Sequence, residues 1–190
     1  VLAIQGIKGK APPKTGQKVL INGAGGGVGT FAIQLAKYYG TEVTAVDSAA
    51  KFELMRSIGA DHVIDYTQED FTKQSKRYDL ILDVVAKKSV FAYRRTLRPK
   101  GQYRAVGGST GRIFQIPFLG SIISRLSSKK IGFLVGQPNN KEDMDFLAEL
   151  YETKNVVPII EKRYPLNEVA DALRYLEEGH VRGKLVITME

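Results

Sequence analysis

A glycine-rich run between an apolar segment and a helix-like one constrains the fold more than any other feature. Five of the seven residues from Gly23 to Gly29 are glycine; "KVLIN" precedes the run and an amphipathic pattern over 30–39 follows it. Glycine inside a regular element is destabilising, because it loses the most backbone freedom on folding. The run therefore predicts a turn with unusual dihedrals, or a backbone that another group must approach closely.

Strand-like and helix-like segments alternate along the chain, which is typical of βαβ units. Residues 109–130 show no clean period, and we expect a loop followed by a helix there, with a lid or a partner surface as the alternative. The sequence predicts an α/β fold, a Rossmann-type doubly wound parallel sheet in three αβα layers. The expected strands cover 18–22, 42–47, 61–66, 78–86, 101–108 and 131–136, and the expected helices 30–39, 51–59, 69–76, 89–97 and 141–155.

Composition narrows the function classes. The 190 residues include no Cys and two His, which excludes disulfides and thiolate metal sites, and we expect no metal. No apolar run reaches membrane-spanning length and no signal peptide is visible, so we expect a cytoplasmic protein without a membrane partner. The net charge of +8 could serve nucleic acid, an acidic membrane surface or an anionic small ligand. The basic residues do not cluster with aromatic ones, and we expect no nucleic-acid partner.

The spacing inside the glycine run fits a variant of the dinucleotide-binding fingerprint. Counting back from Gly29, the frame G-x-G-x-x-G falls on Ala24, Gly26 and Gly29. The free N–H groups and the positive dipole end at the start of a helix can bind a pyrophosphate. The residue against which the pyrophosphate packs must be glycine, because a Cβ there would keep the phosphates away from the backbone. Asp47 ends the second expected strand, where a carboxylate can accept hydrogen bonds from the adenosine ribose; a solvated carboxylate is the alternative. The expected loop contacts are Ala24, Gly25, Gly26, Gly27, Val28 and Gly29.

The chain resembles the medium-chain dehydrogenase/reductase superfamily, and within it the zinc-free quinone oxidoreductase-like branch. Alanine is typical of that branch at the first fingerprint position, where Ala24 stands. The resemblance spans the chain from about Leu2 to Thr188. It rests on the stretches "GQKVLINGAGGGVGTFAIQLAK", "GADHVIDYTQEDF", "YDLILDVV", "LRPKGQYRAVGG" and "YPLNEVADALRYLEEGHVRGKLVIT".

The resemblance implies an NAD(P)-dependent oxidoreductase that transfers hydride between nicotinamide and a quinone, an enone or a related carbonyl compound. Members carry a GroES-like substrate domain before this point, and the chain has no initiator Met, so we expect a truncated piece. We expect residues 1–155 to be the NAD(P)-binding domain. Residues 156–190 would be a strand–helix–strand segment, with Asn167 as helix N-cap and Gly179 after the helix, that joins the absent domain. No catalytic residue can be named; a non-catalytic dinucleotide-binding module, such as a redox sensor, is the alternative.

The resemblance also assigns both ends of the cofactor site. Lys51 and Tyr66 match positions that hold the 2′-phosphate in NADPH-using relatives, whereas Asp47 is the signature of NAD. Ser48 and Lys51 follow directly, and Lys51 could neutralise Asp47, reach the phosphate or be a solvated lysine. We therefore expect NADP or NAD, with a weak preference for NADP. The positions that match the nicotinamide end are Val85, Ala86, Gly107, Gly108, Phe133, Leu134 and Val135.

Two interpretations stay open for the last expected strand of the main sheet, from Ile131 to Gly136. It could pair with a second copy in a homodimer, or it could be a plain edge strand; an unpaired apolar edge favours pairing. His62 and His180 lack a nucleophile or a partner motif beside them, and we expect structural or solvated roles for both.

Overall fold

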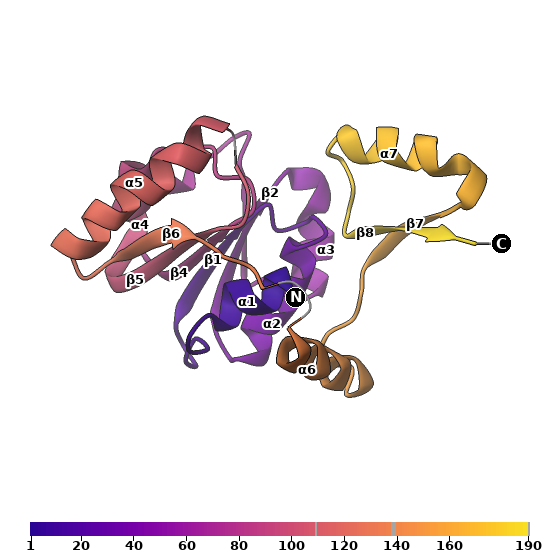
Figure 1. The fold of residues 1–190 in the computed structure, drawn as a ribbon, viewed down its shortest axis with the longest axis horizontal. Helices are drawn as coiled ribbons and strands as arrows, with labels where there is room; N and C mark the ends of the chain where they lie inside the picture. The colour runs from indigo at the N-terminus through magenta and orange to yellow at the C-terminus, as the bar shows by residue number, and fades with distance from the viewer. Residues whose placement is uncertain (109, 138–139, 190) are drawn as a thin grey trace.

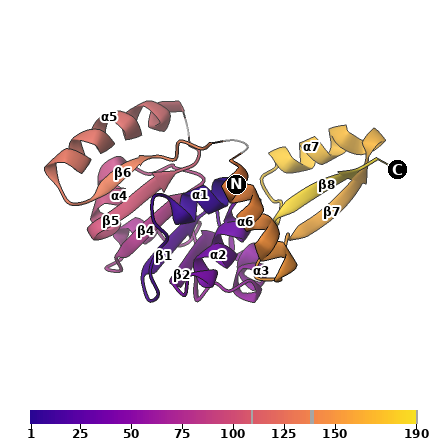
Figure 2. The same cartoon turned by 60° about the horizontal axis from the view of Figure 1, so that its bottom comes forward.

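A parallel six-stranded sheet with helices on both faces forms the body of the protein (Figures 1 and 2). The computed structural model describes residues 1–108, 110–137 and 140–189. The strand order is β3-β2-β1-β4-β5-β6, and a separate two-stranded sheet holds β7 and β8. The strands are β1 (Lys18–Asn22), β2 (Glu42–Asp47), β3 (His62–Asp65), β4 (Tyr78–Asp83), β5 (Leu97–Ala105), β6 (Lys130–Phe133), β7 (Ile160–Pro165) and β8 (Lys184–Thr188). The helices are α1 (Leu2–Lys8), α2 (Gly29–Tyr38), α3 (Phe52–Ser57), α4 (Val90–Thr96), α5 (Thr110–Leu126), α6 (Lys141–Glu152) and α7 (Val169–Glu177).

The central strands are apolar on both sides because each side of the sheet faces its own core. In β1, Val19 and Ile21 pack into one core with α1, α2 and α6, while Leu20 faces the other core, beneath α4 and α5. All three side chains are fully buried. The three-layer αβα sandwich expected from the sequence is confirmed.

The C-terminal strands lie away from the main sheet, at the end of the molecule opposite α5 (Figure 1). β7 and β8 pair in parallel, and α7 connects them. The Gln34 side chain of α2 donates to the Val157 carbonyl (2.9 Å) and accepts from the Val157 N–H (2.8 Å). This pair of hydrogen bonds fixes the chain as it leaves the main body for the small sheet.

The structure corrects the expectation for the segment before β6. A single 17-residue helix, α5, covers Thr110–Leu126, where we expected a loop and a helix; Ser109 lies outside the described residues. The sequence shows no amphipathic period here because the helix is apolar on its buried and on its exposed side. The buried side carries Ile116 and Ile123, and the exposed side Phe118 and Leu126. Within the described part of the chain, neither α5 nor another helix has the length and hydropathy to cross a bilayer.

Smaller expectations were also wrong. β4 and β6 end at Asp83 and Phe133, three residues before the expected ends of those strands. The helix expected over 69–76 is only a 3₁₀ turn at Phe71–Lys73, capped by the Asp70 side chain, which accepts from the Thr72 N–H. β5 begins at Leu97, four residues early, because the turn before Gly101 is an irregularity inside the strand. Asn167 lies within a 3₁₀ turn and does not cap α7, whose N-cap is Glu168.

Acid should weaken the fold partly through Glu42, at the amino end of β2. Its carboxylate lies 2.9 Å from Lys76 Nζ and 3.3 Å from Lys18 Nζ, and the Lys76 hydrogen bond is the largest cause that lowers its pKa to about 2. Because the pKa of Glu42 is lower in the folded than in the unfolded protein, its ionised carboxylate stabilises the fold at any pH above about 4.5. This stabilisation is lost as the pH falls from about 4.5 towards 2. We expect Glu42→Gln to cost roughly 1 kcal/mol of unfolding free energy at neutral pH and little in acid, after allowance for solvent screening.

Urea unfolding at a series of pH values measures this contribution. Glu152→Gln is the matched control, because Glu152 is exposed and has no ion pair among the described residues. Equal destabilisation by Glu42→Gln at neutral and acid pH would show that the ion pairs of Glu42 do not stabilise the fold.

Candidate functional site

The expected cofactor residues lie along one edge of the sheet, where the parallel strands end. The glycine loop follows β1, and β2 and β4 flank β1 on its two sides. From β1 the strand order runs outward to β2 and β3 on one side and to β4, β5 and β6 on the other, so the sheet has its topological switch point at β1. Open α/β sheets bind ligands at this point. The other expected positions end or follow β2 (Asp47, Ser48, Lys51), β3 (Tyr66), β4 (Val85, Ala86), β5 (Gly107, Gly108) and β6 (Phe133, Leu134, Val135).

The glycine loop is fastened to the end of β2 by backbone hydrogen bonds. Gly23 has φ of 80°, and its N–H and that of Ala24 both donate to the Val46 carbonyl, at 3.0 and 3.1 Å. A Cβ on Gly29 would collide with the Gly23 carbonyl and the Ala24 backbone. Gly29 therefore lets α2 begin directly against the loop, which is the close packing expected of the last fingerprint glycine.

The start of α2 presents free N–H groups beside an open position. No side chain caps this end of the helix, and the N–H groups of Gly27, Val28 and Gly29 have no acceptor in the described part of the chain. An ideal Cβ on Gly26 would have only the Gly23 carbonyl oxygen near it, at 3.6 Å. Free amides next to an unfilled glycine position form the cradle that a pyrophosphate needs.

Asp47 holds the glycine loop in place. Its buried carboxylate accepts from the Gly25 N–H (2.9 Å) and the Ser48 N–H (2.9 Å), and Lys51 Nζ lies 3.5 Å away. Lys51 is also buried, so it is not a solvated lysine. The ion pair fits the interpretation in which Lys51 neutralises Asp47, and contact with a 2′-phosphate stays a prediction. A Cβ on Gly25 would collide with the Lys51 side chain, which explains that glycine.

The small C-terminal sheet adds a cation that the sequence did not predict. The Gly183 N–H donates to the Gly25 carbonyl at 2.9 Å, which brings the start of β8 onto the glycine loop. A Cβ on Gly27 would lie 2.9 Å from Lys184 Nζ. The ammonium group thus stands next to the free amides of α2, although Lys184 is far from them in the sequence.

Asp83 organises the loop after β4. Its fully buried carboxylate accepts from the N–H groups of Val85 (3.0 Å) and Ala86 (2.7 Å), from Asn22 Nδ2 (2.8 Å) and from the Tyr103 hydroxyl (3.0 Å). Burial, with the Asp83 carboxylate beside it, raises the pKa of Tyr103, so the hydroxyl stays protonated and donates. Ala86 is held at φ of 43°, a conformation rare for residues other than glycine.

The loop shaped by Asp83 also contacts the loops on both sides. A Cβ on Gly23 would lie 2.9 Å from Val85 Cγ2, and one on Gly107 would lie 3.1 Å from the Val84 carbonyl oxygen. The loops after β1, β4 and β5 are therefore one packed surface. Beyond these loops, the Leu134 N–H donates to the Ala105 carbonyl (2.7 Å). The next residue, Val135, is exposed at the same edge of the sheet.

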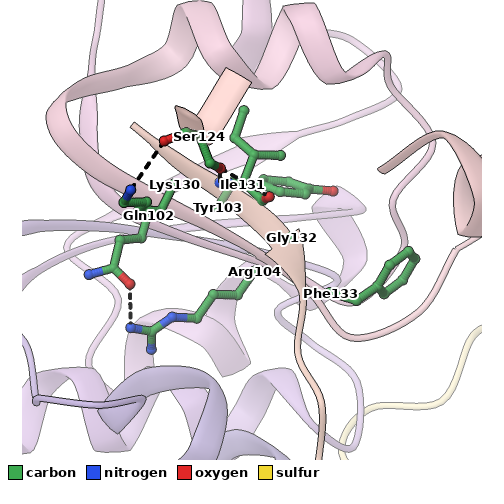
Figure 3. Close-up of a pocket in the computed structure, with 8 residues that line it drawn as sticks. All are labelled: Gln102, Tyr103, Arg104, Ser124, Lys130, Ile131, Gly132 and Phe133. Carbon is green, nitrogen blue, oxygen red and sulfur yellow. Dashed lines mark hydrogen bonds between the residues drawn. The ribbon is translucent and has the colours of Figure 1, made fainter. Parts of the chain in front are cut away.

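Two pockets help to delimit the candidate site. One of about 230 Å³ lies where α5, β5 and β6 meet, with Lys130 Nζ donating to the Ser124 carbonyl and Arg104 to the Gln102 side chain (Figure 3). The other, of about 350 Å³, lies between α1 and α2 and is bordered by Gly27, Val28 and Lys184. The second pocket adjoins the glycine loop, whereas the pocket of Figure 3 includes only Phe133 among the expected cofactor positions.

The histidines lie outside the site. His62 opens β3, and its Nε2 lies 3.0 Å from the Glu42 carboxylate at the amino end of β2. His180 is exposed just after α7. Across the described ranges, no group of three or more His, Cys, Asp or Glu side chains could hold a metal ion.

Lys184, Asp83 and Asn22 are the residues that sequence reasoning missed. Asp83 is the last residue of β4, and its partners Asn22 and Tyr103 lie on neighbouring strands. The one available signal was that Asn22 and Asp83 are the polar last residues of two apolar strands. Lys184 carried no local signal.

Comparison with known proteins agrees with the fold. The family model described as zinc-binding dehydrogenase matches residues 58–187. The chain is 36% identical over 195 residues to the Bos taurus protein named NAD(P)H oxidoreductase RTN4IP1, mitochondrial, covering 92% of this chain and 48% of that protein. It is 32% identical over 178 residues to the Arabidopsis thaliana NADPH-dependent alkenal/one oxidoreductase, chloroplastic, covering 90% of this chain and 40% of that protein.

A solved structure gives the same result. The quinone oxidoreductase from Coxiella burnetii superimposes with a TM-score of 0.83 at 28% identity, covering 100% of this chain and 57% of that one. The chain spans about half the length of the curated relatives it matches. Sequence and structure together show that the chain belongs to the medium-chain dehydrogenase/reductase superfamily, in its quinone oxidoreductase-like branch.

Proposed function

We propose that this chain is the cofactor-binding part of an oxidoreductase and binds a nicotinamide dinucleotide, NADPH in preference to NADH. When bound, such a cofactor supplies hydride transfer, and the substrate class we propose is a quinone, an enone or a related carbonyl compound. The cradle at the start of α2 carries the proposal: three free N–H groups, an unfilled position at Gly26 and the Lys184 ammonium. An anionic pyrophosphate would gain from all three.

The environment of Asp47 supports the preference for NADPH. A free carboxylate at this position repels a 2′-phosphate, but Lys51 neutralises Asp47, whose oxygens already accept from Gly25 and Ser48. Tyr66 follows β3, its N–H donates to the Asp47 carbonyl (3.3 Å) and its side chain is 60% exposed. An exposed phenol beside a neutralised carboxylate suits the ribose phosphate better than Asp47 alone would predict.

At the other end of the cofactor, we propose that the loops after β4, β5 and β6 hold the nicotinamide. Asp83 fixes Val85 and Ala86. The other positions lie at or just after the ends of the adjoining strands: Gly107, Gly108, Phe133, Leu134 and Val135. These residues would orient the ring and exclude water on one side, which is a positioning role. The other side, with the catalytic residues, would belong to a domain that residues 156–190 join.

Oligomeric state and location stay predictions. The strand expected from Ile131 to Gly136 ends at Phe133 in the structure; β6 has one neighbour in the sheet, so its free edge could pair with a second copy in a homodimer. A cytoplasmic location is likewise proposed; the names of two relatives place those proteins in mitochondria and chloroplasts.

Calorimetric titration with NADPH and NADH in parallel tests the proposal. We expect both to bind, NADPH at least several-fold more tightly. Binding of neither to protein that is folded by circular dichroism would refute the proposed function, and tighter binding of NADH would refute the cofactor preference alone.

Replacing Lys184 tests the contribution of the small sheet. A charge-assisted hydrogen bond to phosphate contributes about 1.5–3 kcal/mol, so we expect Lys184→Met to weaken dinucleotide binding roughly 10- to 100-fold. Lys162→Met is the matched control, because Lys162 lies in the partner strand β7 with its Nζ 4.3 Å from the Tyr164 ring. Similar affinities for both variants would show that Lys184 does not contact the ligand.

A further inference from the structure

One continuous segment supplies all of the excess positive charge. Residues 84–140 contain eleven lysines and arginines and no aspartate or glutamate, although the whole chain has 28 basic and 20 acidic residues. Outside this segment the acidic residues slightly outnumber the basic ones. The net charge of +8 is therefore a local property, and it needs a local explanation.

The fold collects much of this charge at the amino ends of three adjacent strands. Arg94 and Arg95 lie in the last turn of α4, before β5, and the residues after α5 lead into β6. Arg77, which lies outside the basic segment, directly precedes β4 and adds to them. Lys129 Nζ donates to the Arg94 carbonyl at 2.7 Å, and the Lys100 N–H donates to Ser128 Oγ at 3.2 Å, so these elements touch. We call this cluster the basic edge: Arg77, Arg94, Arg95, Lys100, Arg125, Lys129 and Lys130.

The basic edge has no carboxylate partner in the described residues. Eleven ion pairs are recorded elsewhere, and none includes a member of the cluster. Six of the seven side chains are exposed, and Lys129 is half-buried. Burial, with Arg94 and Arg77 nearby, lowers the pKa of Lys129. Like charges held together without counter-charges indicate a surface that meets an anionic partner.

An apolar stripe on α5 leads to the basic edge. Phe118, Ile122 and Leu126 are 70%, 43% and 83% exposed, and their four-residue spacing places them on one side of the helix. The opposite side, with Ile116 and Ile123, packs into the core. α5 lies at the outer end of the molecule (Figures 1 and 2). Leu126 follows Arg125 directly, so the apolar stripe and the cations adjoin.

We propose that the basic edge and the apolar stripe of α5 dock on the surface of an anionic lipid bilayer. The proposed dinucleotide cannot explain the cluster, because its site lies at the carboxyl ends of the strands. A second copy of the chain would bring the same positive charge. Nucleic acid would pair with the cations but would leave the apolar stripe exposed. An anionic bilayer meets both features, since its phosphates pair with the cations and its interface takes the apolar side chains.

The docking is peripheral. The expectation of no membrane partner rested on the absence of a long apolar run, which concerns only crossing of the bilayer. Cofactor binding would stay open, because the site and the docking surface lie at opposite edges of the sheet.

Co-sedimentation with vesicles tests the proposal. We expect binding to vesicles of phosphatidylcholine with phosphatidylglycerol, weakening as salt rises, and none to phosphatidylcholine alone. Each cation near an anionic surface contributes roughly a fivefold gain, so Arg125→Gln with Lys129→Gln should lower partitioning about 25-fold. Phe118→Ser with Leu126→Ser should lower it at least about tenfold.

Lys10→Gln with Lys14→Gln is the matched control. Both lysines are exposed and outside the basic edge, and this double variant removes two positive charges, as Arg125→Gln with Lys129→Gln does. This variant should keep at least half of the wild-type partitioning, and thermal unfolding should show that every variant is folded. An equal loss in the control, or binding without dependence on anionic lipid, would overturn the proposal. So would binding of a DNA duplex in place of vesicles, or a stable dimer that only the Phe118 and Leu126 changes dissociate.

Discussion

Replacing Gly26 by valine is expected to abolish dinucleotide binding and to leave the fold intact. The added Cβ would meet only the Gly23 carbonyl oxygen, at 3.6 Å, so the folded protein has room for it. The rest of the valine side chain would occupy the space in front of the free N–H groups of Gly27, Val28 and Gly29. A ligand held at these amides cannot share that space. We expect affinity to fall more than 100-fold, roughly 2.7 kcal/mol or more, by calorimetry.

Ala11→Val is the control for this substitution. Ala11 is exposed and precedes the amino end of β1, whereas the glycine loop follows the carboxyl end of that strand. This variant should bind NADPH as the wild-type protein does, and both variants should unfold near the wild-type temperature. If Gly26→Val keeps its affinity within about threefold of the control, the pyrophosphate does not lie on this loop.

Local patterns in the sequence predicted the fold well where each strand is buried on both faces. The bounds of β1 and β2 agree with the expected runs to the residue, because Val19, Leu20 and Ile21 leave no polar face to blur the ends. The hydrophobic period did not predict a helix that is apolar on both its buried and its exposed side. α5 buries Ile123 and exposes Leu126, and a period of 3.6 disappears when both sides carry the same kind of residue.

The candidate site was predictable only in part, for a related reason. The glycine loop and Asp47 belong to one strand–turn–helix–strand unit, and their spacing carries the information. Lys184 reaches the same loop through Gly183, whose N–H donates to the Gly25 carbonyl. Contacts between residues so far apart depend on how the small sheet packs against the main body, which no local pattern encodes.

Removing the charge of Asp83 should affect the nicotinamide end of the proposed cofactor site and leave the other end unchanged. Asp83→Asn keeps the shape of the side chain but replaces a charged acceptor by a neutral one, and its amide group would face the Tyr103 hydroxyl. We expect the N–H groups of Val85 and Ala86 to be held less firmly, with a loss of roughly 1–3 kcal/mol in unfolding free energy. Hydrogen exchange should then quicken at these two amides and stay slow in β1 and β2.

The same variant tests where the nicotinamide lies. Because Asp83 shapes the loop after β4, we expect Asp83→Asn to weaken NADPH binding about tenfold and to leave binding of 2′-phospho-ADP-ribose, which lacks the nicotinamide, within about twofold. Asp79→Asn is the control: Asp79 lies at the other end of β4, where it accepts from the Lys18 N–H and pairs with Arg98. It should destabilise the protein without changing either affinity. Equal weakening of both ligands by Asp83→Asn would mean that the loop after β4 supports the whole site and does not select its nicotinamide end.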